Sequence, residues 1–198
     1  MDVLALTGFL VSATALLGSP GPGIAALIVV GRSRGWRGGL RYYAGLQIGL
    51  AAAAAITAAG LFSLLSAFPA AIHVMTIVAA VYLLYLALKV ATAPVGAAFI
   101  ARPGASSAIA GAFLGITNPK AYVVFASLFA SRTVLQSRPE SDALLKWALC
   151  VLVIVVVDLA WLFVGVALKR ASLAPRADRV LNVSLGVTIL AAAALTFA

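Results

Sequence analysis

Six apolar stretches, each long enough to cross a bilayer as an α-helix, most constrain the fold of this chain. About 20 helical residues span the roughly 30 Å of hydrocarbon. The stretches cover residues 3–31, 42–66, 70–91, 106–131, 147–168 and 180–198. Of the 198 residues, 64% are apolar and only 10% are charged, and the mean hydropathy is +1.15, unlike any ordinary soluble domain. We therefore expect an all-α membrane protein of six transmembrane helices, with residues 1–198 forming a single transmembrane domain in the lipid bilayer. The first stretch lacks the positive start of a signal peptide, so we expect it to be retained.

The basic residues predict the orientation of these helices. Ten of the fourteen Lys and Arg residues follow odd-numbered stretches. They are Arg32, Arg34, Arg37 and Arg41 after the first, Lys89 and Arg102 after the third, and Lys169, Arg170, Arg176 and Arg179 after the fifth. Arg132, Arg138 and Lys146 lie on the opposite side. Because cytoplasmic loops are enriched in Lys and Arg, both termini are predicted to lie outside. The net charge of +9 then reflects membrane anchoring rather than a nucleic-acid partner.

Two of the stretches are interrupted by proline at corresponding positions. The first contains LLGSPGPGIAAL and the fourth GITNPKAYVV, which places Pro20 and Pro119 half a chain length apart. Each interruption opens a group of three stretches, and because three is odd the second group crosses the bilayer in the opposite direction. The pattern predicts a 3+3 inverted repeat, with halves of about 1–100 and 101–198 and with helices one and four broken.

The two interruptions also share their local chemistry. Ser19 precedes Pro20 and Asn118 precedes Pro119, and a cap residue followed by proline is typical of a helix start. Two helix N-termini near the membrane midplane would present backbone N–H groups and positive dipole ends to an anion. Gly21 would let a ligand approach the backbone closely, as would the nearby Gly23. The alternative is that each proline only kinks its helix.

Three further polar side chains within the stretches bear on function. Asp158, in VVVDLAWLF, would cost about 2.5 to 3.5 kcal/mol to insert as a carboxylate, so we expect it to face a cavity or a partner and to exchange protons during transport. Lys120 is the only basic residue near mid-membrane depth, and it would pair with Asp158 or with a substrate carboxylate. A static Asp158–Lys120 ion pair that only assembles the bundle is the alternative. Gln47 would bind substrate or join two helices by a hydrogen bond.

Two pairs of glycines are more typical of packing than of a binding site. Gly45 and Gly49 lie four residues apart in the second stretch, and Gly111 and Gly115 do so in the fourth. Small residues at this spacing let two helices approach closely. We therefore expect both pairs to form helix–helix contacts.

Several segments together resemble the LysE/RhtB family of bacterial amino-acid exporters. They are SPGPG, GWRGGLRYYAGLQIGLA, GAFLGITNPKA, VVVDLAWL and LNVSLGVTIL, which occur in order along the whole chain. The resemblance implies a six-span inner-membrane carrier that expels amino acids or related small metabolites, with proton antiport as its energy source. From the two broken helices we expect one half to rock against the other, which gives alternating access. The implied substrate-binding positions are Ser19, Pro20, Gly21, Pro22, Gly23, Gln47, Asn118, Pro119 and Lys120, and Asp158 is the implied proton-coupling residue.

Other functions fit the sequence less well. An intramembrane enzyme would need a catalytic set, whereas the chain has one His and one Cys and no G-x-S-x-G or H-E-x-x-H motif. A metal-ion exporter of the same superfamily would need several carboxylate, His or Cys ligands within the spans. A passive channel would have no need of two matched breaks. No cofactor and no bound metal are expected, and both a monomer and a homodimer are compatible with the sequence.

Overall fold

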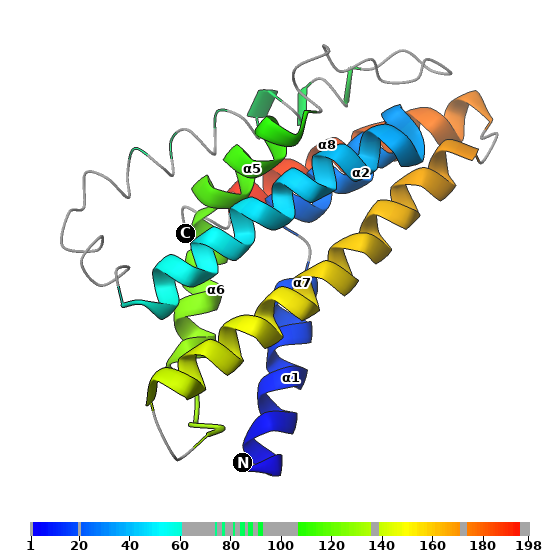
Figure 1. Cartoon of the computed structure of the whole chain (residues 1–198). Helices are drawn as coiled ribbons and strands as arrows, with labels where there is room; N and C mark the ends of the chain where they lie inside the picture. Colours follow the sequence, from blue (N-terminus) through cyan, green and yellow to red (C-terminus); the bar gives the residue numbers. More distant parts are fainter. Residues whose placement is uncertain are drawn as a thin grey trace.

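The computed structural model describes residues 2–19, 21–60, 107–135, 139–170 and 174–194, with scattered positions between 74 and 92. The long described segments are mainly helical and contain no β-strand. Their helices are α1 (Val3–Gly18), α2 (Pro22–Ala58), α5 (Ala108–Thr117), α6 (Pro119–Phe129), α7 (Pro139–Arg170) and α8 (Pro175–Ala194), shown in Figure 1. Most of the expected span 70–91, the end of the last span (195–198) and Pro20 lie outside the described residues.

Both expected interruptions separate two helices. The chain bends by 59° between α1 and α2 and by 55° between α5 and α6. In the described part of the chain, one helix, Glu140–Lys169, is long and apolar enough to cross a membrane by itself. Each bent pair meets the same criterion when its two helices are taken together, so the described residues hold one to three candidate spans. α7 and α8 also begin earlier than the expected spans 147–168 and 180–198.

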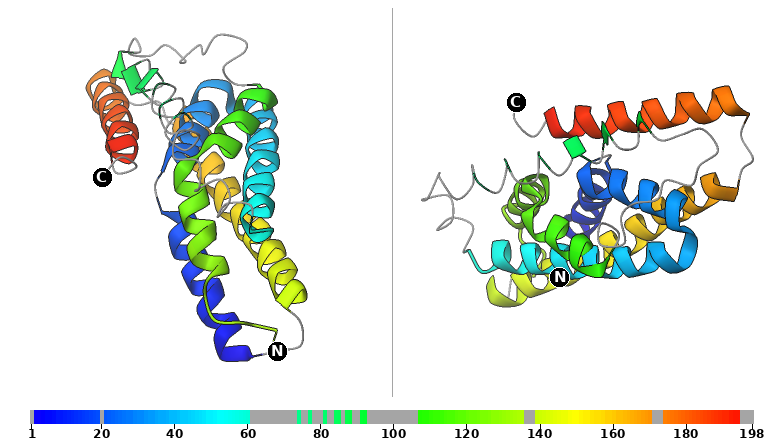
Figure 2. Two further views of the ribbon diagram at one scale, coloured as in Figure 1. Left: turned by 90° about the vertical axis from the view of Figure 1, so that its left-hand side faces the viewer. Right: turned by 90° about the horizontal axis from the view of Figure 1, so that it is seen from above.

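The two bent pairs run in opposite directions. α1 begins where α6 ends, and the Asp2 backbone N–H donates to the Val134 carbonyl oxygen at 3.0 Å. In Figure 1, α1 and α6 occupy the lower half of the molecule, α2, α5 and α8 the upper half, and α7 crosses both. α2 is the central element and packs against α5, α6, α7 and α8. The two breaks therefore meet near the middle of the molecule, at the level where the halves join (Figure 2).

A single glycine replaces the loop that we expected over residues 32–41. α2 is 37 residues long and contains one non-helical residue, Gly35, with φ 66° and ψ −162°. Only glycine adopts this left-handed region without strain. The chain folds back there and brings Gly39 close to Gly31. A Cβ on Gly39 would lie only 3.6 Å from the Cα of Gly31. Both helices therefore continue beyond the apolar stretches that end at Gly31 and begin at residue 42, and they join almost directly at Gly35 because glycines lie at their contact.

The C-terminus of α2 is also set by glycine. The Ala59 backbone N–H donates to the Ala55 carbonyl oxygen, and Gly60 follows with φ 73°. A left-handed glycine just past the last turn is a common helix stop. The helix therefore ends before residue 66, where the sequence predicted the end of the span.

The glycine pairs pack α2 against α5, as the sequence predicts. A Cβ on Gly45 would overlap the carbonyl oxygen of Ala108, and one on Gly49 would overlap that of Ala112. In return, a Cβ on Gly111 would overlap the carbonyl oxygen of Tyr42. Backbone-to-backbone contact of this kind requires small residues on both helices. It holds the second half of α2 rigidly beside the broken pair α5 and α6.

A buried ion pair fastens the end of the molecule that holds the N-terminus. The Lys146 ammonium lies 3.0 Å from Asp142 Oδ2 and donates to the Ser131 carbonyl oxygen at 3.0 Å. Asp142 Oδ1 accepts from the backbone N–H groups of Val134 and Leu135 at 2.6 and 2.7 Å. The sequence placed Lys146 in a loop, but it lies in α7 and is only 2% exposed. A buried charge needs partners, and the acceptors around the Lys146 ammonium make its burial possible.

Candidate functional site

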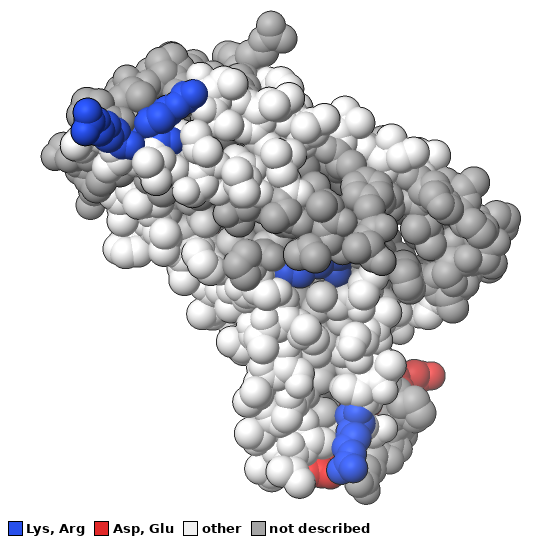
Figure 3. Space-filling view, turned by 180° about the vertical axis from the view of Figure 1, so that it is seen from behind, with Lys and Arg blue, Asp and Glu red and all other residues white. Residues whose placement is uncertain are grey.

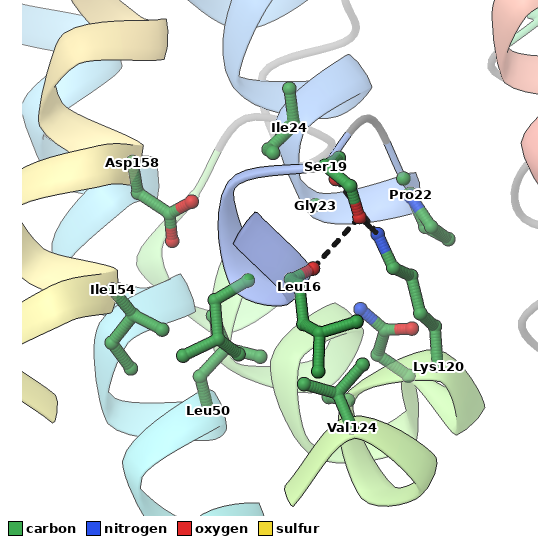
Figure 4. Close-up of a pocket in the computed structure, with 14 residues that line it drawn as sticks. Leu16, Ser19, Pro22, Gly23, Ile24, Leu50, Lys120, Val124, Ile154 and Asp158 are labelled. Carbon is green, nitrogen blue, oxygen red and sulfur yellow. Dashed lines mark hydrogen bonds between the residues drawn. The ribbon is translucent and has the colours of Figure 1, made fainter. Parts of the chain in front are cut away.

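Lys120 links the two helix breaks directly. Its ammonium donates to the carbonyl oxygen of Ser19 at 2.7 Å and to the Ser19 hydroxyl oxygen at 2.8 Å. Figure 4 shows the Lys120 side chain reaching from α6 to the end of α1. Ser19 follows the last residue of α1, where backbone carbonyls lack helical partners and the helix dipole is negative. A cation is therefore stabilised at this position. The contact joins two residues, Lys120 and Ser19, that are 101 apart in sequence.

The two helices that follow the breaks begin with the same pattern. In α2, Gly21 is the N-cap and Pro22 is the first helical residue. In α6, Asn118 is the N-cap and Pro119 is the first helical residue, as the sequence predicts. The interpretation of Ser19 as an N-cap was wrong: Ser19 is the C-cap of α1, and its hydroxyl donates to the Leu16 carbonyl oxygen at 2.8 Å. In SPGPG both prolines follow a residue suited to capping a helix. The helix α2 begins at the second of these prolines, Pro22.

Neither helix start is capped by a side chain. Gly21 has none, and the Asn118 side chain makes no capping hydrogen bond. The first intrahelical hydrogen bond of α2 runs from the Ala25 backbone N–H to the Gly21 carbonyl oxygen. The backbone N–H groups of Gly23 and Ile24, which precede Ala25 in the first turn, therefore have no acceptor within the helix. The N-terminus of α2 therefore keeps donors and the positive end of its dipole for another acceptor.

Asp158 faces the breaks from α7. It is 4% exposed, and its Oδ2 accepts a hydrogen bond from the Gln47 side-chain amide at 2.8 Å. Gln47 therefore joins α2 to α7, which agrees with the helix-joining interpretation. In Figure 4, Asp158 and Lys120 lie on opposite sides of the Ser19–Gly23 segment. The site thus holds an acid and a base on separate helices, with the first break between them.

Two buried polar atoms around the breaks accept no hydrogen bond from any residue that the structure describes. They are Asn118 Oδ1 and Gln47 Oε1. Asn118 is only 6% exposed. A buried carbonyl oxygen without a donor costs about 1 to 3 kcal/mol. Asn118 Oδ1 is therefore suited to receive an N–H donor from a ligand in the cavity that Asn118 lines, such as an ammonium group.

These residues surround a small cavity of about 40 Å³. It is lined by Leu16, Leu17, Ser19, Gly21, Pro22, Gly23, Ile24, Leu50, Asn118, Lys120, Ala121, Val124, Ile154 and Asp158. Such a volume holds one or two water molecules and is too small for an amino acid. To admit a solute as large as an amino acid, the helices around the breaks would have to move apart.

Most of the predicted site residues lie together in this cavity wall. Gln47 reaches it through Asp158, and Pro119 stands at the start of α6 without lining it. The predicted site residues did not include the apolar part of the wall, although helical spacing holds a signal for it. Val124 lies one turn after Lys120, and Ile154 one turn before Asp158, so each shares a helix face with a predicted residue.

Comparison with known proteins adds independent information. The sequence profile of the family described as LysE type translocator matches residues 14–197. The cysteine/O-acetylserine efflux proteins of Salmonella choleraesuis (strain SC-B67) and Salmonella typhi are each 36% identical to this chain over 76 residues. That match covers 38% of this chain and 39% of the length of these curated relatives. No solved structure matches the chain significantly.

Proposed function

This chain belongs to the LysE type translocator family, a family of transporters and not of enzymes, and we propose that it exports amino acids or related small metabolites. The observation that carries the proposal is the meeting of both helix breaks at one cavity that also contains Lys120 and Asp158. The matched relatives are named for efflux of cysteine and O-acetylserine, so these two compounds are the first substrates to test.

The charges at the breaks complement both ends of an amino acid. The N-termini of α2 and α6 favour its carboxylate through their backbone donors and dipoles. The end of α1 already binds the ammonium of Lys120 at Ser19. An amino-acid ammonium has the same chemistry and would compete with Lys120 for this carbonyl oxygen. The displaced Lys120 would then be available to pair with the substrate carboxylate.

We propose that the chain lies in the bacterial inner membrane as six spans in a 3+3 inverted repeat of residues 1–100 and 101–198. The opposite directions of the two bent pairs support the repeat. The charge distribution supports an orientation with both termini outside. On the face shown in Figure 3, the charged residues at the upper left end that the structure describes are all Lys or Arg, whereas the lower end has both basic and acidic residues.

Export is proposed to use alternating access coupled to protons. The cavity of about 40 Å³ must open to admit an amino acid, and the Lys120–Ser19 bond joins the two segments that would separate. Rocking of one half against the other would expose the site to each side in turn. Asp158 would take up and release the proton that drives the cycle, since it lines the same cavity.

Transport by purified protein in liposomes tests this function. With the vesicle interior acidic, labelled cysteine or O-acetylserine is expected to accumulate in exchange for protons, and a protonophore is expected to prevent it. Liposomes without protein provide the baseline. Equilibration that ignores the proton gradient would instead indicate a passive channel, and accumulation of divalent metal ions without amino acids would indicate a metal-ion exporter.

Gly21→Ala is expected to slow transport by about tenfold or more, because hydrogen bonds to charged groups contribute about 1.5 to 3 kcal/mol. A Cβ at this position would lie 2.9 Å from Lys120 Nζ, so the flexible Lys120 side chain would be pushed away from Ser19. Gly18→Ala is the matched control, since its Cβ would make ordinary contact with Val157 at 3.5 Å and Gly18 does not line the cavity. Initial rates of labelled substrate uptake measure both. Equal rates for the two variants would remove the Lys120–Ser19 contact from the mechanism.

A further inference from the structure

Two adjoining hollows lie at the opposite end of the molecule from the N-terminus, beside the Gly35 turn. The first, of about 430 Å³, is lined by Arg34, Gly35, Trp36, Arg37, Val166 and Lys169. The second, of about 300 Å³, is lined by Trp36, Phe163, Val166 and Ala167. Because the hollows share Trp36 and Val166, a cationic compartment continues into an apolar one. None of the described residues lining either hollow is acidic.

The fold positions the cations of the first hollow. The left-handed Gly35 reverses the chain between Arg34 and Arg37. The Lys169 ammonium reaches across this turn from α7 and donates to the Ser33 carbonyl oxygen at 3.3 Å. Arg34 lies close to residue 38, where only glycine fits, because a Cβ on Gly38 would come within 2.5 Å of the Arg34 Cβ. Three cationic side chains from two helices are therefore gathered around one hollow.

Along α7, the apolar hollow lies nearer the middle of the candidate span Glu140–Lys169 than the cationic hollow does. Phe163, Val166 and Lys169 follow one another at three-residue intervals along one face of α7. At about 1.5 Å per residue, the Phe163 backbone lies about 9 Å deeper along the span than that of Lys169. Phe163 is 62% exposed and Trp36 is 42% exposed, so both present apolar surface. Tryptophan favours the membrane interface, where its ring has apolar and polar neighbours.

We propose that this end of the protein binds one anionic phospholipid, with its phosphate among Arg34, Arg37 and Lys169 and an acyl chain along Trp36 and Phe163. Basic pockets between transmembrane helices recognise lipid headgroups through this charge complementarity. The apolar hollow distinguishes the lipid from a soluble phosphate, which would use only the cationic part. If the proposed orientation holds, the lipid belongs to the cytoplasmic leaflet.

Trp36 provides a reporter inside the proposed site. The full chain carrying Trp147→Phe and Trp161→Phe retains Trp36 as its one tryptophan. It is reconstituted in phosphatidylcholine vesicles with a minor fraction of either brominated phosphatidylglycerol or brominated phosphatidylcholine. Bromine on the acyl chain quenches Trp36 only when the lipid lies beside it. Brominated phosphatidylglycerol is expected to quench more strongly at the same fraction, and equal quenching by the two lipids would overturn the proposal.

Charge variants test the headgroup contacts. Arg37→Gln and Lys169→Gln are each expected to lower the preference for phosphatidylglycerol about fivefold. Arg37 is exposed, so its replacement should leave the fold intact. Arg41→Gln is the matched control, because Arg41 is exposed on the same helix but lines neither hollow. An equal loss with Arg41→Gln would indicate unspecific surface charge, and loss of the preference on adding inorganic phosphate would indicate a soluble anion; either result would overturn the proposal.

Discussion

Replacing Asp158 with Asn is expected to abolish proton-driven net export, reducing it to the level of vesicles without protein. The carboxyl group is the proposed carrier of the coupling proton, and an amide cannot take up and release that proton. Asn still offers a carbonyl oxygen to the Gln47 amide, which now donates to Asp158 at 2.8 Å. The packing between α2 and α7 should therefore survive the change.

Exchange of labelled for unlabelled substrate separates two roles of Asp158. If Asp158 carries only the proton, exchange without a gradient should continue in the Asn variant, because substrate alone can return the site to each side. If Asp158 holds the substrate ammonium, exchange should stop as well. Glu140→Gln is the matched control, since this carboxyl group lies exposed at the start of the same helix. Normal net export by Asp158→Asn would remove the residue from the coupling mechanism.

The largest loss of stability is expected for Lys146→Met. This change leaves the Asp142 carboxylate buried without its cation, and breaking a buried pair from one side costs about 3 to 5 kcal/mol. It also removes the donor that the Ser131 carbonyl oxygen accepts at 3.0 Å. The free energy of unfolding in detergent, measured with a denaturant, should fall by this amount.

A nearby exposed cation, Arg132, provides the control that shows whether the loss of stability comes from the burial of the ion pair. Arg132 is exposed, and Arg132→Met should change the free energy of unfolding by less than about 0.5 kcal/mol. Lys146→Met should leave substrate specificity unchanged, because Lys146 does not line the cavity between the breaks. If the two variants were equally stable, the Asp142–Lys146 pair would not hold α7 to the end of α6.

The sequence was sufficient for features that depend on local backbone chemistry. Proline has no N–H and cannot continue a helix that it interrupts, so Pro119 marks the start of α6 directly. Glycines four residues apart expose backbone on one helix face, and Gly45 and Gly49 meet α5 as predicted. Asp158 could be singled out because a carboxyl group in an apolar span needs a particular environment.

Tertiary structure decided which of several locally equivalent possibilities the chain uses. Ser19–Pro20 and Gly21–Pro22 are both suitable helix starts, and the structure begins α2 at Pro22 while Ser19 accepts the Lys120 ammonium instead. Lys146 has one partner nearby in sequence, Asp142, but its burial also depends on the carbonyl oxygens of Phe129 and Ser131, which come from another segment of the chain. Hydrogen bonds and ion pairs depend on distances of about 3 Å between residues that lie far apart in sequence. Only the packed helices determine such distances.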